Sequence, residues 1–273
     1  MSAALRVGIV GTGEMGRPLV NRLLAAGHQV AAYARRTEVR DELAAAGVEV
    51  VDDLLALAPG RDVLLVYVYR DDQVREVLLD AGLAEAMSPG STIVVHTTSN
   101  PRTMDAIAER LTGRGVGVVD APGSGGPNKV AAGTLTLFAG GAPDDVERCR
   151  PLFAAYAEQV VGAGGLGAGQ RMKLLNNLLF GAHVELAVEA ARLASELGLD
   201  PAAMAQALHT CSGASYGLDL LGLMGSGEVL VQAAGRFVHK DVLVARAVAD
   251  DLGADLGTFT PVTDAVLNRT ATA

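Results

Sequence analysis

The first half of the chain alternates short apolar runs with longer segments of helical spacing, such as Arg17–Ala26 and Pro101–Leu111. The runs are Arg6–Val10, Gln29–Tyr33, Val48–Val51, Val63–Val68, Thr92–His96 and Val116–Val119, and two more, Thr134–Ala139 and Gln159–Val161, could extend the set. Most of them are apolar throughout, which is typical of strands buried on both faces. The pattern predicts a mostly parallel sheet with helices on each side.

The pattern changes after Gly162. Residues Ala163–Gly169 contain four glycines and predict a hinge. From Met172 to Leu197, apolar residues recur at helical spacing, and Gly198 follows as a helix-ending glycine. The recurring residues are Leu175, Leu178, Leu179, Ala182, Leu186, Ala190, Leu193 and Leu197. We expect an α/β domain over residues 1–162 and an all-α domain over residues 163–273, joined by this long helix.

A glycine-rich sequence of the form G-x-G-x-x-G occupies residues 11–16. Its members are Gly11, Thr12, Gly13, Glu14, Met15 and Gly16. The sequence follows the first predicted strand and opens the first predicted helix, as a dinucleotide-binding turn requires. The first glycine permits a tight turn, the second lets the backbone approach a pyrophosphate, and the third lets helix and strand pack closely. The α/β domain is therefore predicted to be a Rossmann-type domain that binds a dinucleotide at residues 11–16.

The residues after the second strand bear on the choice of cofactor. A cofactor with a free ribose 2′-hydroxyl usually meets Asp or Glu at this point, but the chain has Arg35 and Arg36. Arg35 could pair with the additional phosphate of NADP, and Arg36 could stack on or flank the adenine. The sequence favours NADP over NAD, although both arginines could also be solvated loop charges.

Composition narrows the class further. The net charge is −9 and no basic block is present, which argues against a nucleic-acid partner. Cys149 and Cys211 lie far apart and match no metal-ligand spacing, so neither a disulfide framework nor a metal site is expected. No long uncharged apolar stretch could cross a membrane, and the N-terminus shows no signal-peptide pattern. We expect a cytoplasmic enzyme.

Three further segments carry a resemblance. They are Asp120–Gly126 followed by Gly133–Thr136, then Gly167–Asn177, and finally Lys240–Asp241. Together with residues 11–16, in this order and at these separations, they resemble the β-hydroxyacid dehydrogenase family. That family includes 3-hydroxyisobutyrate dehydrogenase, tartronate semialdehyde reductase and, more distantly, phosphogluconate dehydrogenase. The resemblance runs from Arg6 to about Val266.

The first of these segments holds a Ser-Gly-Gly turn, Ser124, Gly125 and Gly126, after a predicted strand. Ligands of open α/β sheets bind at the carboxyl ends of strands. A hydroxyl group and unshielded amides form a good cradle for a carboxylate. A purely structural turn is the alternative, and the resemblance implies that the turn binds the substrate carboxylate.

Lys173 and Asn177 are four residues apart at the start of the long helix, so they share one face. A lysine near a helix N-terminus is disfavoured by the helix dipole, which makes its place there informative. The resemblance implies that Lys173 is the catalytic acid/base and Asn177 the amide that orients the substrate. On sequence alone Asn176 and Asn177 could trade roles, and Lys173 without the resemblance would be a surface lysine.

Two other positions gain a role from the resemblance. Thr98 lies in a Ser/Thr-rich segment that resembles the family's loop beside the nicotinamide, with an N-cap for the following helix as the alternative. Lys240 resembles a lysine that reaches from the helical domain toward cofactor and substrate. Without the resemblance it would be a surface charge.

The chain departs from the family pattern in places. Gly123 stands where valine is usual, so the substrate loop is expected to be more mobile. The sequence ends earlier than typical relatives, before their closing helical segment, and we expect substrate closure and the dimer contact to differ from theirs. Phe180 stands where phosphogluconate dehydrogenases carry a glutamate, which argues against decarboxylation. Lys173 argues against the related imine reductases, which usually replace it.

These inferences predict an oxidoreductase that passes a hydride between NADP(H) and a small β-hydroxy acid or its semialdehyde. A homodimer or higher homo-oligomer through the helical domain is expected. An imine or short-aldehyde reductase is the alternative in chemistry. A non-catalytic NADP-binding sensor or scaffold is the alternative in class.

Overall fold

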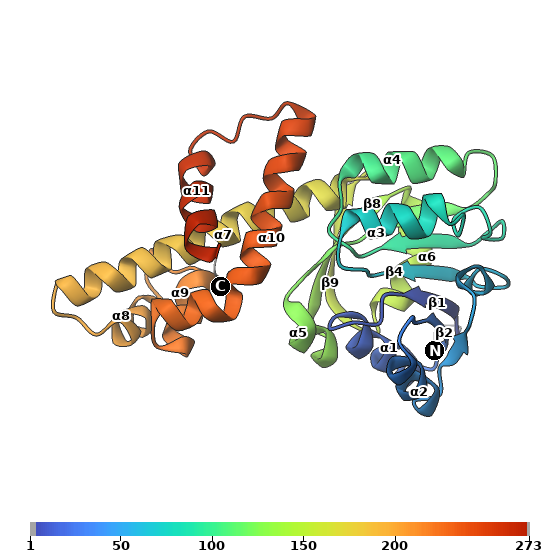
Figure 1. Cartoon of the computed structure of the whole chain (residues 1–273), viewed down its shortest axis with the longest axis horizontal. Coiled ribbons are helices and arrows are strands. Elements are labelled where there is room, and N and C mark those ends of the chain that lie inside the picture. The colour runs from blue at the N-terminus through green and yellow to red at the C-terminus, as the bar shows by residue number, and fades with distance from the viewer. Residues whose placement is uncertain (1–3, 272–273) are drawn as a thin grey trace. The chain divides into compact units, whose positions relative to one another are not determined.

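The computed structural model describes residues 4–271, apart from the side chain of Arg236. Contacts divide the chain into two compact units, Met1–Lys173 and Leu174–Ala273. The division falls inside one long helix, α7 (Ala168–Glu196), which Figure 1 shows in yellow and light orange. The domain boundary that the sequence predicts after Gly162 stays a prediction.

The first unit is built on one nine-stranded sheet among the described residues. Its strands are β1 (Arg6–Val10), β2 (Gln29–Tyr33), β3 (Glu49–Val51), β4 (Val63–Val66), β5 (Thr92–Val95), β6 (Gly117–Asp120), β7 (Gly123–Ser124), β8 (Leu135–Gly141) and β9 (Ala157–Gly164). Their order is β3-β2-β1-β4-β5-β6-β8-β7, with β9 paired to β8. Strands β1 to β6 pair in parallel, whereas β8 runs antiparallel to β6 and β7. The predicted mostly parallel sheet is confirmed.

Helices cover both faces of this sheet. One face carries α1 (Gly16–Ala25), α2 (Thr37–Ala45), α5 (Gly126–Ala132) and α6 (Pro143–Phe153), and the other carries η1 (Leu54–Leu57), α3 (Asp71–Arg75), η2 (Glu76–Asp80) and α4 (Pro101–Arg110). Because successive strand residues point to opposite faces, Val63 and Leu65 pack in one core while Leu64 and Val66 pack in the other. All four side chains are buried, which explains why this run has no polar position.

The second unit is helical, as predicted. It contains α7 from Leu174 onward with α8 (Pro201–Leu208), α9 (Tyr216–Met224), α10 (Gly227–Leu252) and α11 (Phe259–Thr270). Within the described residues, no helix is long and apolar enough to cross a membrane.

The start of α7 differs from the sequence prediction. The helix begins at Ala168, four residues before the predicted Met172, and β9 continues to Gly164. Only residues 165–167 of the predicted hinge lie outside both elements. Glycine propensity is low in strands and helices, but here tertiary hydrogen bonds, described below, hold the first turn of α7 in place. Lys173 therefore lies in the second turn, not in the first.

The buried face of α7 also differs from the apolar stripe seen in the sequence. Leu178 and Ala182 are buried, whereas Leu175, Leu179, Leu186, Leu193 and Leu197 are between 48% and 68% exposed. The face that packs within the second unit is built instead from small residues such as Ala187 and Ala191, which let neighbouring helices approach closely. The exposed leucines form a surface that we call the leucine stripe.

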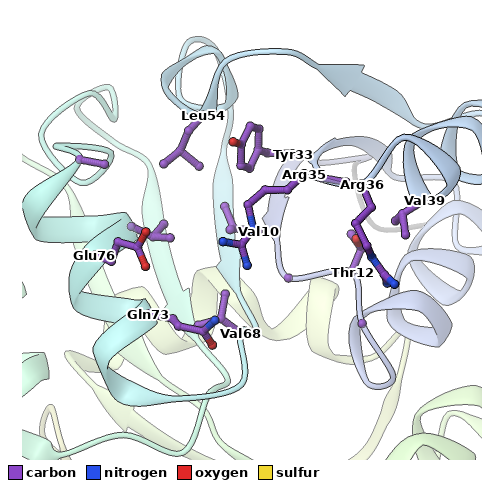
Figure 2. A pocket seen from close by; sticks show the side chains of 15 residues that line it. Val10, Thr12, Tyr33, Arg35, Arg36, Val39, Leu54, Val68, Gln73 and Glu76 are labelled. Carbon is purple, nitrogen blue, oxygen red and sulfur yellow. The ribbon is translucent and has the colours of Figure 1, made fainter.

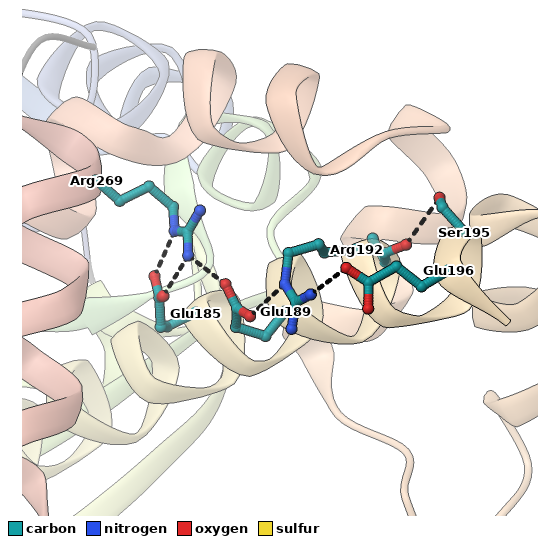
Figure 3. Close-up of polar contacts among 7 residues, drawn as sticks. Glu185, Glu189, Arg192, Ser195, Glu196 and Arg269 are labelled. Carbon is teal, nitrogen blue, oxygen red and sulfur yellow. Dashed lines mark hydrogen bonds and ion pairs between the residues drawn. The ribbon is translucent and has the colours of Figure 1, made fainter.

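Ion pairs connect α11 to α7 (Figure 3). Arg269 donates to both oxygens of Glu185, at 2.8 and 2.7 Å, and to Glu189 at 2.6 Å. Arg192 then bridges Glu189 and Glu196 along the exposed side of α7. The Glu185 side chain is only 8% exposed, so its charge depends on Arg269.

Candidate functional site

The central feature of the first unit is the change of direction in strand order between β1 and β4. From this point β2 and β3 extend to one side and β5 and β6 to the other, which opens a crevice at the carboxyl ends of the strands. A pocket of about 330 Å³ lies there. It is lined by Val10, Gly11, Thr12, Gly13, Tyr33, Ala34, Arg35, Arg36, Val39, Leu54, Val68, Gln73, Glu76, Val77 and Ala81.

The three glycines of residues 11–16 meet different surroundings. Gly11 has φ of +97°, and a Cβ atom there would lie 2.2 Å from the carbonyl oxygen of Tyr67. A Cβ at Gly16 would lie 1.9 Å from the carbonyl oxygen of Gly11. At Gly13, by contrast, a Cβ would meet nothing within 4 Å. Gly11 and Gly16 are thus required by the fold, while Gly13 leaves open space where a ligand could approach the backbone.

The start of α1 suits an anion. The N-cap residue of α1, Met15, makes no side-chain capping bond. No capping side chain therefore accepts the first backbone N–H groups of the helix. Such amides, together with the helix dipole, favour a phosphate group. A dinucleotide therefore fits the residues present. Thr12 lines the pocket, whereas Glu14 and Met15 are not part of its lining.

Both predicted arginines belong to this pocket. Figure 2 shows Arg35 extending across the pocket and Arg36 near Thr12 and Val39. Over residues 4–271, no carboxylate is paired with either guanidinium group. Glu76 on the opposite wall is the pocket's carboxylate, and no sequence motif marks it because it follows no strand directly. Both arginine side chains are exposed, so the NADP contact and the alternative of solvated loop charges both stay predictions.

The first turn of α7 is held by a carboxylate from another strand. Asp120, the last residue of β6, accepts the backbone N–H groups of Gly167 and Gln170, each at 2.7 Å. The Asp120 side chain is fully buried, and this burial raises its pKa to about 6 although the amide hydrogen bonds oppose the shift. Asp120 thus caps the N-terminus of α7. Gly167, the residue before the helix, has no side chain and cannot cap it in this way.

Gln170 extends these contacts to a second strand end. Its Nε2 donates to the carbonyl oxygen of Thr97 at 2.9 Å, and its Oε1 accepts the N–H of Ser99 at 2.8 Å. The loop after β5, which holds Thr98, is thus bonded to α7. The N-cap of α4 is Asn100, whose side chain accepts the N–H of Arg102, so the capping alternative does not apply to Thr98.

The Ser-Gly-Gly turn joins β7 to α5, with Ser124 at the end of the strand and Gly126 at the start of the helix. Gly125 and Gly126 have φ of +137° and +73°, which favour glycine, and α5 begins without a side-chain cap. A Cβ at Gly123 would lie 2.8 Å from Leu135 Cδ2. Leu135 therefore fills the space that a larger side chain would take there. The predicted mobility of this loop stays a prediction.

Lys173 and Asn177 are both buried, at 9% and 3% exposure. The alternative of a surface lysine is therefore wrong. Asn176 donates to Asn177 Oδ1 at 3.3 Å, while the buried Nδ2 of Asn177 has no hydrogen-bond partner among the described residues. Burying a hydrogen-bond donor without a partner costs free energy, so this Nδ2 is suited to donate to an acceptor atom of a bound molecule. This favours Asn177 over Asn176 for contact with a substrate.

Lys240 lies on α10 in the second unit, where its Nζ is 3.1 Å from Asp241 Oδ1. Phe180 packs against Tyr216, with ring centroids 5.7 Å apart. In the part of the chain that the structure describes, no cluster of three His, Cys, Asp or Glu side chains could hold a metal ion.

The sequence matches two family models that together cover most of the chain. Residues 6–165 match the NAD binding domain of 6-phosphogluconate dehydrogenase. Residues 167–272 match the NAD-binding model of NADP-dependent 3-hydroxyisobutyrate dehydrogenase.

Individual proteins agree with these matches. The chain is 34% identical to L-threonate dehydrogenase of Cupriavidus necator over 77% of this chain and 71% of the relative. It is 30% identical to 3-hydroxyisobutyrate dehydrogenase of Pseudomonas aeruginosa over 89% of this chain and 85% of the relative. Among solved structures, Psf3 in complex with NADP⁺ and 2-OPP superposes with a TM-score of 0.81 at 27% identity, over 97% of this chain and 93% of the other.

The first unit's dinucleotide crevice and the matches over both units define a nicotinamide-dependent oxidoreductase. The chain belongs to the β-hydroxyacid dehydrogenase family. It is accordingly an NAD(P)-dependent dehydrogenase of the hydroxyacid class, and the sensor or scaffold alternative is set aside.

Proposed function

We propose that this enzyme interconverts a short β-hydroxy acid and its semialdehyde with NADP(H), using Lys173 as general acid/base. The observation that carries the proposal is the burial of Lys173 one turn beyond the contacts of Gln170 with the loop after β5. The relatives named for 3-hydroxyisobutyrate and L-threonate support a substrate with a carboxylate and a nearby hydroxyl group.

Each site residue of the chain has its own role in the proposed reaction. When bound, the nicotinamide supplies the hydride acceptor or donor. In oxidation, Lys173 removes the substrate hydroxyl proton at Nζ, and in reduction its ammonium form returns that proton. Ser124 and the amides of Gly125 and Gly126 hold the carboxylate, and the unsatisfied Nδ2 of Asn177 donates to the reacting oxygen. Thr98 and Lys240 contact cofactor or substrate in this proposal.

The test of the acid/base role is Lys173→Met. With NADPH and a panel of methylmalonate, succinate and tartronate semialdehydes and glyoxylate, kcat should fall by about 10²–10⁴-fold, as for loss of general acid–base catalysis. Lys173→Arg is the matched control because it keeps the charge but cannot release a proton near neutral pH, and it should be equally impaired. Full turnover by either variant, with normal cofactor binding, would refute the role.

The preference for NADP rests on Arg35 and Arg36 in the pocket. Changing both to serine should weaken NADPH binding by about 10–100-fold, the worth of one or two charge-assisted hydrogen bonds, and weaken NADH binding much less, because NADH has the adenine but not the 2′-phosphate. Arg40→Ser is a suitable control, since Arg40 pairs with Asp52 and does not line the pocket. An equal loss for both cofactors would contradict the preference.

A homodimer or higher homo-oligomer is proposed from the leucine stripe on α7, because large exposed apolar patches mark association surfaces. A second copy of the chain is the proposed occupant. A cytoplasmic location is proposed from the sequence alone, on the two isolated cysteines and the acidic composition.

A further inference from the structure

The start of α7 is fixed to the sheet by side chains that the sequence analysis did not assign. Asp120 reaches it from the end of β6, and Gln170 reaches back from the helix to the loop after β5. Strands β5 and β6 are parallel neighbours, with Val95 opposite Asp120. Four hydrogen bonds therefore connect one helical turn to the carboxyl ends of two adjacent strands.

This connection is buried and closely packed. Asp120, Gln170 and Ser99 are each 0% exposed. Glycines on two neighbouring elements make room for the carboxylate: a Cβ at Gly140 would lie 2.5 Å from Asp120 Oδ1, and one at Gly169 would lie 2.8 Å from Asp120 Oδ2. A buried carboxylate is costly unless it is hydrogen-bonded, and here each oxygen has its own amide donor.

The position of this cap has a consequence for Lys173. A local cap would fix where the helix begins, but a cap from β6 also fixes where the first turn of α7 lies relative to the sheet. Lys173 follows Gln170 by three residues and Gly169 by four, so it lies on the same side of the helix, one turn further along. A displacement of the first turn would displace Lys173.

We propose that Asp120 and Gln170 are positioning residues that hold Lys173 in place relative to the loops after β5 and β6. This inference rests on the proposed acid/base role of Lys173. Thr98 lies in the loop after β5, and the loop after β6 leads directly into β7, which contains Ser124. The same bonds therefore position Lys173 relative to the proposed cofactor contact and the proposed carboxylate contact. Proton transfer depends on geometry at the scale of an ångström, which gives such bonds a measurable effect on turnover.

The experiment is Asp120→Asn, which preserves shape but places an NH₂ group against one of the two backbone donors. We expect kcat to fall by about 10²-fold, the loss typical of a displacement near 1 Å, with KM for NADPH unchanged. The matched control is Asp71→Asn. Asp71 holds α4 in a similar way, accepting from Asn100 N at 3.1 Å and Thr103 Oγ1 at 3.0 Å, and its variant should keep kcat.

The double variant with Lys173→Met separates positioning from a merely structural role. If Asp120 acts through Lys173, Asp120→Asn should not lower kcat further once the lysine is absent. A further loss of the same factor would overturn the inference, as would full kcat in Asp120→Asn. Full kcat in Lys173→Met would instead overturn the proposed function. Should Asp120→Asn fail to fold, Gln170→Met gives the same test, with a kcat loss expected and full kcat overturning the inference.

Discussion

The two ends of α7 are held by different physics. In the first unit, Ala168–Lys173 is fixed by buried side chains bonded to backbone groups. In the second unit, Glu185–Glu196 is held by arginine–carboxylate pairs in which every group except Glu185 is at least 35% exposed. Bonds to backbone groups fix position, whereas exposed ion pairs add modest stability and tolerate movement. The end of α7 that carries the proposed catalytic Lys173 is therefore held in a fixed position. The other end is stabilised by ion pairs that allow more movement.

Two glycines on α7 give the sharpest form of this comparison. A Cβ at Gly169 would lie 2.2 Å from the carbonyl oxygen of Phe138, whereas one at Gly181 would lie 2.9 Å from a methyl group of Val242. Because backbone cannot yield as a side chain can, Gly169→Ala should destabilise the protein by about 3 kcal/mol. Gly181→Ala should change stability by less than about 1 kcal/mol, since helix propensity offsets the contact. Thermal unfolding of both variants checks this, and equal effects would contradict it.

Arg269→Met tests the opposite end of the helix. It leaves the largely buried Glu185 carboxylate without its partner, which should cost about 2 kcal/mol, below the value for a fully buried pair because Arg269 is 35% exposed. Denaturant unfolding measures the loss. The kcat of the folded variant should equal that of the parent, and a fall in kcat comparable to that of Asp120→Asn would remove the distinction between the two ends.

The leucine stripe gives the next prediction. Leu186→Gln with Leu193→Gln should shift the protein toward monomer in light scattering, because both side chains are about half exposed or more in the single chain. Stability of the monomer should change by no more than about 0.5 kcal/mol per site, as for surface positions. A parent protein that is already monomeric would refute the proposed dimer.

The smallest effect is expected at Glu196. Its pair with Arg192 spans one helical turn on the exposed side of α7, so Glu196→Gln should cost about 0.3–0.5 kcal/mol. This loss should vanish in high salt, because exposed pairs are screened. A cost near that of Arg269→Met would mean that exposure does not separate these pairs.

Much of the first unit could be predicted from the sequence. The strands β1 and β2 begin and end where the apolar runs do, because both faces of each strand are buried and no polar residue interrupts the pattern. The glycine positions of residues 11–16 follow from local backbone geometry and close packing, which a short sequence specifies directly.

The alternation of strands and helices, the dinucleotide turn and the family could be predicted from the amino-acid sequence, because they depend on local periodicity and on short motifs. The start of α7, its buried face and the contacts of Asp120 and Gln170 depend on long-range packing and were visible only in the folded chain. Apolar periodicity marks several possible helix faces, and the neighbouring helices select one of them. The cap of α7 lies 47 residues before Gly167, and no local pattern reveals a bond over that separation.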